Sequence, residues 1–268
     1  MSEYTNLFAK IQQEAELDMD LTDLVPFGTE GSGNQIKYWK DNRLIKLNSK
    51  YHEAQKEVSC SKLAIAFGID AVRYTANKYT IDNKTFWGCE SVSYLQDNEE
   101  SVSFASLISM KNFAVPMKMS ATDYFLKMTE VISETTKIDA DSVANYILTI
   151  LVFDYIVCNP DRHLSNLEMI HNSSTNAYRF APLFDLGQAF LKLDAMPSQD
   201  QLQMLLHKFK TRPFSSNPEK NIINKDLAKQ IATKFIESAG GFNALKSLDI
   251  NEFHRYLAIK RLHKLLEV

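Results

Sequence analysis

The chain has 268 residues, of which 45% are hydrophobic and 24% charged, a composition typical of a globular protein with one large domain or two lobes. Its formal net charge of −3 and isoelectric point near 6.1 give no overall attraction to nucleic acid or to an anionic membrane, so neither is expected as a direct partner. Three widely separated cysteines, Cys60, Cys89 and Cys158, match neither a disulfide framework nor a metal motif and indicate a reducing, cytoplasmic setting.

No signal peptide or membrane span is expected. Residues 1–20 are acidic and lack the basic start and apolar core of a secretory signal. The longest apolar run, Val143–Val157, is interrupted by Asp154 before it reaches the roughly 18 residues that a membrane span needs. The sequence therefore predicts a cytoplasmic protein, with an effector secreted without a recognisable signal as the alternative.

The first predicted elements are a short amphipathic helix over residues 4–17 and a glycine-rich turn over residues 26–35. Two alternating segments, 35–39 and 43–47, follow and predict a strand, a tight turn and a strand. Glycines let backbone N–H groups approach phosphate oxygens closely, which makes this turn a candidate phosphate cover. The simpler alternative is an ordinary hairpin turn.

Lys46 and Glu57 are candidates for one ion pair. Lys46 lies within an apolar strand, and Glu57 lies on the inward stripe of a helix predicted over residues 52–68. A buried carboxylate needs a cation, and a buried lysine needs an anion. Two solvated side chains are the alternative. Further strands over residues 72–81 and 84–92 complete a small antiparallel sheet with one helix.

Composition changes at the polar, acidic stretch 95–103, which we interpret as the boundary between a first lobe, residues 1–95, and a mostly helical second lobe, residues 96–268. Helices in the second lobe are predicted over residues 104–110, 121–132, 142–158, 201–208, 225–239 and 251–268. The fold class expected is thus α+β.

Asp161, Asn166 and Asp185 fall within one stretch of loop and hairpin that ends at Gly187. A polar loop follows the long apolar helix, and two short extended segments separated by HNSSTNA lead to Asp185. Mg²⁺ prefers a few oxygen ligands together with substrate phosphates. This stretch could hold a nucleotide-bound metal beside a general base, or it could be a polar loop whose side chains satisfy turn amides.

A glycine-rich hairpin, a strand lysine and a helix glutamate are followed by NPDRHLSN and FAPLFDLG. This order of parts resembles the HipA-like serine/threonine kinases, which share the form D-R-H-x-x-N with the phosphatidylinositol kinases. The resemblance covers about residues 28–187 and implies a two-lobed protein-kinase-like fold. It also implies that Mg²⁺ and ATP are cofactors and that the γ-phosphate passes to a hydroxyl. The D-L-G sequence departs from the common D-F-G.

The resemblance assigns catalytic roles to Asp161, His163 and Lys46. Asp161 would orient or accept the proton of the attacking hydroxyl, and Lys46 would neutralise phosphate charge. His163 would either donate to the γ-phosphate or brace the loop. Arg162 is expected to be an ion-pair anchor.

The same resemblance predicts that Asn166 and Asp185 hold Mg²⁺. Ser32 is expected to be an autophosphorylation site, with a plain turn residue as the alternative. The residues predicted to contact the nucleotide are Gly31, Ser32, Gly33, Lys46, Glu57 and Glu90.

A protein with a Ser or Thr hydroxyl is the expected substrate, and an antitoxin is a further expected partner. Residues 211–221 and 96–100 are candidate recognition loops. Two alternatives stay open: a kinase for a small molecule or an inositol lipid, and a nucleotide-binding pseudokinase that acts as a partner-binding module. The intact set of Lys46, Asp161 and both expected metal ligands argues against the pseudokinase.

Overall fold

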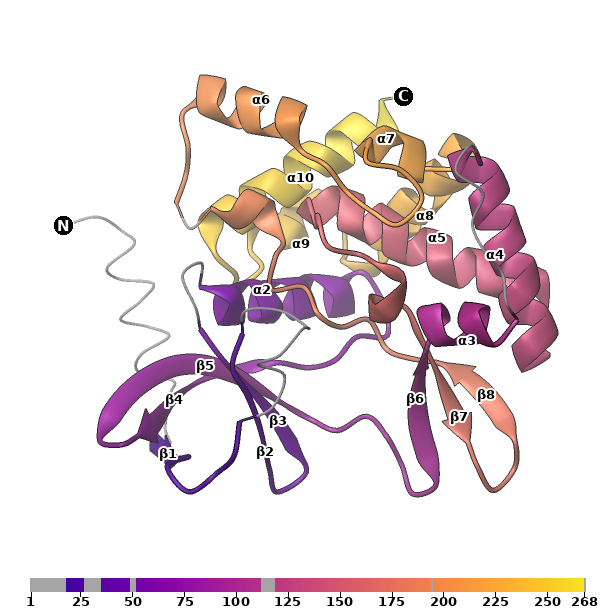
Figure 1. The fold of residues 1–268 in the computed structure, drawn as a ribbon. Coiled ribbons are helices and arrows are strands. Elements are labelled where there is room, and N and C mark those ends of the chain that lie inside the picture. Colours follow the sequence, from indigo (N-terminus) through magenta and orange to yellow (C-terminus); the bar gives the residue numbers. More distant parts are fainter. Residues whose placement is uncertain (1–17, 27–34, 49–51, 112–118, 194, 268) are drawn as a thin grey trace.

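The computed structural model describes most of the chain, namely residues 18–26, 35–48, 52–111, 119–193 and 195–267. A β-sheet lobe with one helix and a mainly helical lobe lie one above the other (Figure 1). The helix predicted over residues 4–17 and the turn residues Gly31, Ser32 and Gly33 lie outside the described residues.

The first lobe is built on a five-stranded sheet in the order β1-β4-β5-β3-β2. Neighbouring strands are antiparallel except for β1, which is parallel to β4. Both hairpins turn at an Asp-Asn pair with positive φ, 47° and 61° at Asp41-Asn42 and 49° and 60° at Asp82-Asn83, as two-residue turns require. The strands are β1 (Asp18–Asp20), β2 (Lys37–Lys40), β3 (Arg43–Leu47), β4 (Thr75–Ile81) and β5 (Lys84–Val92).

The register of this sheet decides which side chains share a face. Lys46 lies opposite Cys89 and Ile45 lies opposite Glu90, so Lys46 and Glu90 are on different faces. Helix α2 (Glu53–Ala66) packs on the Cys89 face. A separate apolar cluster covers the other face and comprises Leu21, Tyr38, Ile45, Leu47 and Tyr79.

A second, separate sheet has three strands. It consists of β6 (Glu99–Ser103), β7 (Glu168–Asn172) and β8 (Ala177–Phe180) in antiparallel order. Strand β6 was expected to be part of a polar boundary stretch. It forms a strand because β7, far along the chain, supplies its hydrogen-bonding partner, and no local pattern reveals that partner.

The helical lobe surrounds one buried helix, α5 (Ala140–Val157). This helix is apolar and long enough to span a membrane by composition, yet most of it is buried within the protein, as expected for a core helix. It begins at the N-cap Asp139 and ends at Cys158, which has φ 51°. The loop that follows it therefore starts from a rigid support.

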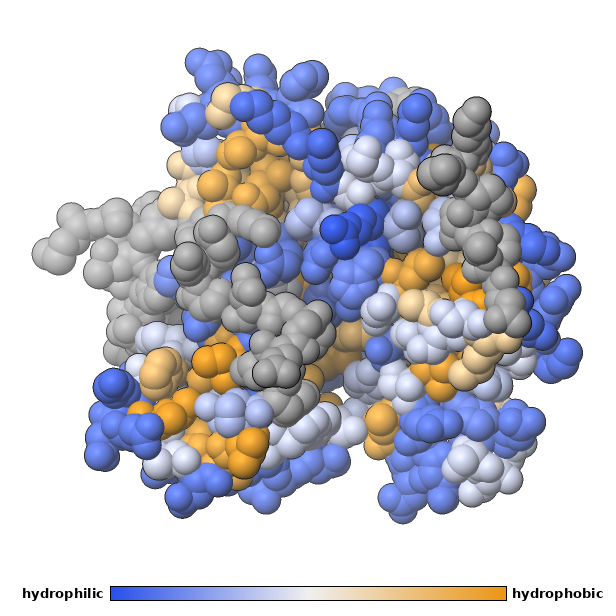
Figure 2. Space-filling model, viewed as in Figure 1, coloured by the Kyte–Doolittle hydropathy of each residue, from blue (hydrophilic) through white to orange (hydrophobic). Residues whose placement is uncertain are grey.

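Most predicted helices of this lobe are confirmed, with ends shifted by a few residues. The short α7 and α9 were not predicted, because helices of one turn leave little periodicity. Hydrophilic side chains cover much of the molecule's outer edge, with smaller apolar patches between them (Figure 2). The remaining helices are α3 (Phe104–Met110), α4 (Ala121–Thr136), α6 (Gln199–Lys208), α7 (Pro218–Asn221), α8 (Lys225–Ser238), α9 (Phe242–Lys246) and α10 (Glu252–Leu266), with short 3₁₀ turns at Leu164–Asn166 and Phe190–Lys192.

Candidate active site

A buried lysine connects the two lobes. The Lys46 ammonium on β3 lies 2.6 Å from Glu57 Oε1 on α2 and 3.0 Å from Asp185 Oδ1, which follows β8. The Lys46 and Glu57 side chains are 3% and 0% exposed, whereas that of Asp185 is 33% exposed. The predicted Lys46–Glu57 pair is thus formed. The Lys46 ammonium also contacts the more exposed carboxylate of Asp185.

The neighbouring charges favour the ionised forms of Lys46 and Asp185. Burial acts to lower the pKa of Lys46, but the Asp185 and Glu57 carboxylates outweigh burial and hold that pKa well above its ordinary value. The Lys46 charge holds the pKa of Asp185 well below its ordinary range, and Lys37 acts in the same direction. Lys37 lies opposite Lys46 in the β2–β3 register and therefore shares its face.

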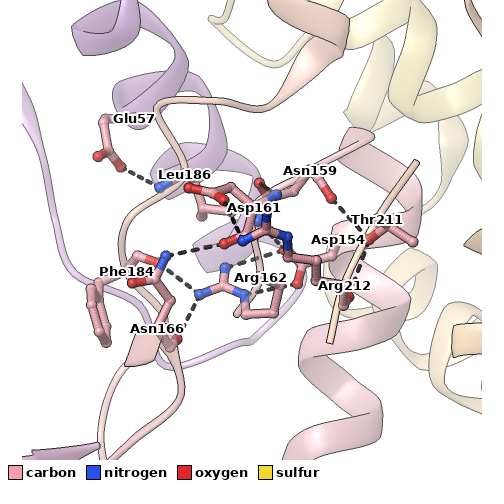
Figure 3. A network of polar contacts seen from close by, with 10 residues as sticks. All are labelled: Glu57, Asp154, Asn159, Asp161, Arg162, Asn166, Phe184, Leu186, Thr211 and Arg212. Carbon is pink, nitrogen blue, oxygen red and sulfur yellow. Dashed lines mark hydrogen bonds and ion pairs between the residues drawn. The ribbon is translucent and has the colours of Figure 1, made fainter. Parts of the chain in front are cut away.

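The segment after Asp185 docks directly on α2. The Leu186 N–H donates to Glu57 Oε2 at 2.9 Å (Figure 3). The Glu57 carboxylate therefore binds both the Lys46 ammonium and this backbone. A Cβ at Gly187 would lie 3.1 Å from the Cβ of Glu53, which explains why a glycine suits this position. The hydrogen bond from Leu186 to Glu57 therefore fixes the position of the D-L-G segment against α2.

The predicted catalytic loop is held from beneath by an arginine that is 0% exposed, Arg162. Its Nε and Nη2 donate to the two oxygens of Asp154 at 2.8 and 3.2 Å. Its Nη1 donates to the carbonyls of Asn166 at 2.8 Å and Phe184 at 3.1 Å (Figure 3). One side chain thus joins α5, the loop and the segment between β8 and Asp185, and the predicted role of Arg162 as an ion-pair anchor is confirmed.

Asp161 and Asn166 are brought together above this anchor. The Asn166 side-chain amide donates to the Asp161 carbonyl at 3.1 Å, and the Asp161 N–H donates to Asn159 Oδ1 at 3.1 Å. The Asp161 carboxylate is 42% exposed, and among the described residues it forms one ion pair, with Arg212 at 3.8 Å. The backbone of Asp161 is therefore held while its carboxylate stays open to a substrate.

The donor set suits a magnesium ion. Asp185 carries a partly exposed carboxylate, and the side-chain oxygen of Asn166 accepts no hydrogen bond from the described residues. One carboxylate and one amide oxygen match the preference of Mg²⁺ for few protein ligands beside phosphates and water. Among the described residues no group of three or more His, Cys, Asp or Glu side chains offers an alternative metal site.

Comparison with known proteins identifies the family. Residues 33–241 match the model of the HipA-like C-terminal domain. The chain belongs to this HipA-like family. No curated protein sequence matches it.

Solved structures include two relatives of this HipA-like chain. CtkA, a proinflammatory kinase of Helicobacter pylori, superposes with a TM-score of 0.59 and 18% identity over 94% of this chain and 95% of its own. HipA of Shewanella oneidensis MR-1, solved with HipB and operator DNA, gives a TM-score of 0.46 and 14% identity over 99% of this chain and 70% of its own. The likeness to CtkA shows that this chain has a kinase fold.

Two predictions at the HipA-like site need comment. The structure separates Glu90 from Lys46, since Glu90 lies on the other face of the sheet and binds Arg43 and the Tyr79 hydroxyl, the latter at 3.0 Å. We therefore assign Glu90 to the packing of the sheet. The His163 side chain makes no hydrogen bond within the described residues, which gives no support to its role as a brace for the loop.

Three parts of the site were not predicted from sequence. Asp154 and Asn159 support the catalytic loop, and Arg212 approaches Asp161. An aspartate in an apolar helix was a usable signal for the first, because a buried carboxylate needs a cation. The candidate recognition loop, residues 211–221, contains Arg212, but no pattern singled out this residue, which lies about 50 residues beyond Asp161.

Proposed function

We propose that this chain is an ATP-dependent protein kinase that uses Mg²⁺ to transfer the γ-phosphate to a Ser or Thr hydroxyl. The observation that carries the proposal is the contact of Lys46 with both Glu57 and Asp185, residues 11 and 139 positions away. An isolated buried ion pair is weak evidence of function. This one leaves the Asp185 carboxylate 33% exposed, so it is accessible to a nucleotide-bound metal, as phosphoryl transfer requires.

Each residue has a physical task in this reaction. Lys46, held by Glu57, offers its charge to ATP phosphates, and Asp161 orients the acceptor hydroxyl and takes its proton. Asn166 and Asp185 would hold Mg²⁺, which neutralises charge on the β- and γ-phosphates when bound. Positioning and charge neutralisation supply most of the rate in such reactions.

The first test compares Asp161→Asn with wild type, using radiolabelled ATP and Mg²⁺. Loss of general-base action should lower the labelling rate by about 10²- to 10⁴-fold. The matched control is Asp226→Asn, an exposed aspartate on α8, which should label as fast as wild type. Equal labelling by the wild type and Asp161→Asn would reject the role assigned to Asp161.

A second test separates a kinase from a nucleotide-binding module. ATP with Mg²⁺ should raise the melting temperature, because a ligand that binds only the folded state stabilises it by mass action. EDTA should remove much of that rise. If ATP stabilises the protein but no phosphate moves to any protein or small-molecule acceptor, the pseudokinase alternative is favoured. Transfer only to a small molecule or an inositol lipid would favour the other alternative.

Autophosphorylation at Ser32 is a further part of the proposal. A dianionic phosphate in a glycine-rich turn would repel ATP phosphates or be captured elsewhere, and either event would displace the turn. Incubation with Mg²⁺ and ATP should add one phosphate to Ser32, detected by mass spectrometry, and Ser32→Ala should lack it. An active enzyme without phosphate at Ser32 would remove this idea. The antitoxin partner and the cytoplasmic location stay predictions.

A further inference from the structure

The loop between α6 and α7 is held in place by buried contacts. Asn221, 3% exposed, accepts from the N–H groups of Phe214 and Ser215 at 3.1 and 3.2 Å and donates to the Ser215 carbonyl at 2.6 Å. The Phe214 ring packs edge-on against Tyr124 and Phe125 of α4, with ring centroids 5.3 and 5.6 Å away. The loop is thus an ordered part of the helical lobe.

This loop is also bonded to the catalytic loop. Thr211, 8% exposed, donates through its hydroxyl to the carbonyl of Asn159 at 3.2 Å. Asn159 in turn binds Asp154 and the Asp161 N–H, so the backbone beside Arg212 and the backbone of Asp161 share one support (Figure 3). The separation between the backbones of Arg212 and Asp161 is therefore set by the fold.

The Arg212 guanidinium itself is only loosely engaged. Its side chain is 61% exposed, and among the described residues its one charged contact is Asp161 Oδ1 at 3.8 Å, beyond hydrogen-bond distance. Within the described part of the chain the guanidinium makes no hydrogen bond. An exposed pair of this kind contributes little to stability, so another anion could bind the guanidinium at small cost. The loop's own anchors are Asn221, Phe214 and Thr211, and none of them needs Arg212.

The position of Arg212 favours the acceptor over the nucleotide. In Figure 3 Arg212 approaches Asp161 from the side of Thr211 and Asn159, whereas Glu57 and Leu186 lie on the other side of the view. The proposed phosphate cation, Lys46, contacts Glu57 and Asp185 and forms no ion pair with Asp161 among the described residues. A cation next to the base but away from the nucleotide side would meet the part of the substrate that carries the hydroxyl.

We propose that Arg212 is a specificity-determining residue that binds an acidic side chain of the protein acceptor, close to the Ser or Thr that Asp161 addresses. This inference rests on the proposed kinase function. An extended peptide advances about 3.3 Å per residue, so a guanidinium this near to Asp161 reaches a carboxylate within two or three residues of the acceptor. The planar guanidinium matches a carboxylate bidentately and repels a basic side chain.

The test uses a position-scanning library of Ser and Thr peptides with radiolabelled ATP. Wild type should select Asp or Glu at one position near the acceptor. In each variant, kcat/KM for the best acidic peptide is divided by kcat/KM for the same peptide with Ala there, so a general loss of activity cancels. Arg212→Gln should lower this ratio about tenfold or more, and Arg212→Glu should turn the preference toward Lys or Arg.

The matched control is Lys210→Glu, the same charge reversal at an exposed residue two positions earlier on the same loop. It should leave the ratio close to wild type, because Lys210, unlike Arg212, forms no ion pair with Asp161 among the described residues, and interactions between exposed charges are weak and screened by salt. Arg212→Lys should keep part of the preference, since it retains the charge but loses the fork. The KM for ATP should be unchanged in Arg212→Gln.

Several results would overturn the inference about Arg212 and leave the kinase activity standing. They are a wild type without acidic preference, a ratio unchanged in Arg212→Glu, and a wild type that labels itself but no peptide. An equal drop in the ratio for Lys210→Glu would also overturn it, because it would show attraction by the loop's charge in general. A protein that labels neither itself nor any acceptor would overturn the proposed function instead.

Discussion

Asp154 and Asp185 each pair with a buried cation, and the two pairs differ in what is left open. Asp154, 3% exposed, binds Arg162 through both oxygens and also accepts from Asn159 at 2.8 Å. Asp185 has one partner among the described residues, Lys46, and is 33% exposed. Its backbone has φ 57°, a conformation that side chains other than glycine seldom adopt.

This difference indicates that Asp154 supports the structure, whereas Asp185 is available for the reaction. The carboxylate of Asp154 is fully satisfied, so it serves to hold Arg162 and with it the loop above. The carboxylate of Asp185 has hydrogen-bonding capacity left and an unusual backbone, and such features gather at functional sites. The same residue type is therefore structural in one pair and available to a ligand in the other.

Asp185→Asn weakens the Lys46–Asp185 pair and should lower activity more than stability. Lys46 would keep Glu57, but one charged magnesium ligand would be lost. We expect phosphoryl transfer to fall on the order of 10³-fold, corresponding to several kcal/mol of lost electrostatic stabilisation. Steady-state labelling with ATP measures the rate, and urea unfolding should show a smaller loss of stability than Asp154→Asn causes. Unchanged transfer would contradict the metal-binding role.

Asp154→Asn disrupts the Asp154–Arg162 pair and should lower the free energy of unfolding. It leaves the Arg162 charge, 0% exposed, without its counter-ion, and removing one partner of a buried pair costs about 3–5 kcal/mol. Urea denaturation followed by circular dichroism measures this loss. A change below about 1 kcal/mol would show that Arg162 does not depend on Asp154.

A third buried group, His254, should sharpen the comparison through its pH dependence. His254 on α10 shares a 3.0 Å hydrogen bond with Ser59 on α2 and stacks on Phe190. Burial, with a smaller contribution from the Lys56 ammonium, lowers its pKa from 6.5 to about 3. The unfolded chain therefore binds a proton between pH 6.5 and 3 that the folded chain does not.

It follows that this contribution to stability is complete above about pH 6.5 and is lost as the pH falls, by about 1.4 kcal/mol per pH unit at most. His254→Gln has no such group. We expect it to lose about 1–2 kcal/mol less than wild type between pH 7 and pH 5, measured from urea midpoints at both pH values. Parallel losses in the two proteins would refute the assignment.

The smallest effect is expected at an exposed ion pair. Lys127 and Glu130 on α4 lie 2.7 Å apart with side chains 41% and 52% exposed. Lys127→Ala should change the free energy of unfolding by no more than about 0.5 kcal/mol, since surface pairs are well solvated. A loss comparable to that of Asp154→Asn would show that burial does not explain the contrast between pairs.

Much of this site was predictable because its parts have local signals. The apolar strand around Lys46 and the helical stripe that contains Glu57 predicted that both side chains face inward. The two residues form the expected ion pair. The turns at Asp41-Asn42 and Asp82-Asn83 were visible as turn chemistry. The side of the sheet on which Glu90 lies was not visible, because a period of two gives alternation but not register.

By itself, the sequence determined the order of parts: a glycine-rich turn, a strand lysine, a helix glutamate, D-R-H-x-x-N and D-L-G. Spacing and residue type are local properties, so they can be read from the sequence alone. Only the tertiary structure decided that the Asp154 carboxylate is buried and the Asp185 carboxylate partly exposed. It alone also decided that β6 pairs with β7 and that Arg212 lies beside Asp161. These depend on burial and on contacts between distant segments, which chain packing creates and no local pattern encodes.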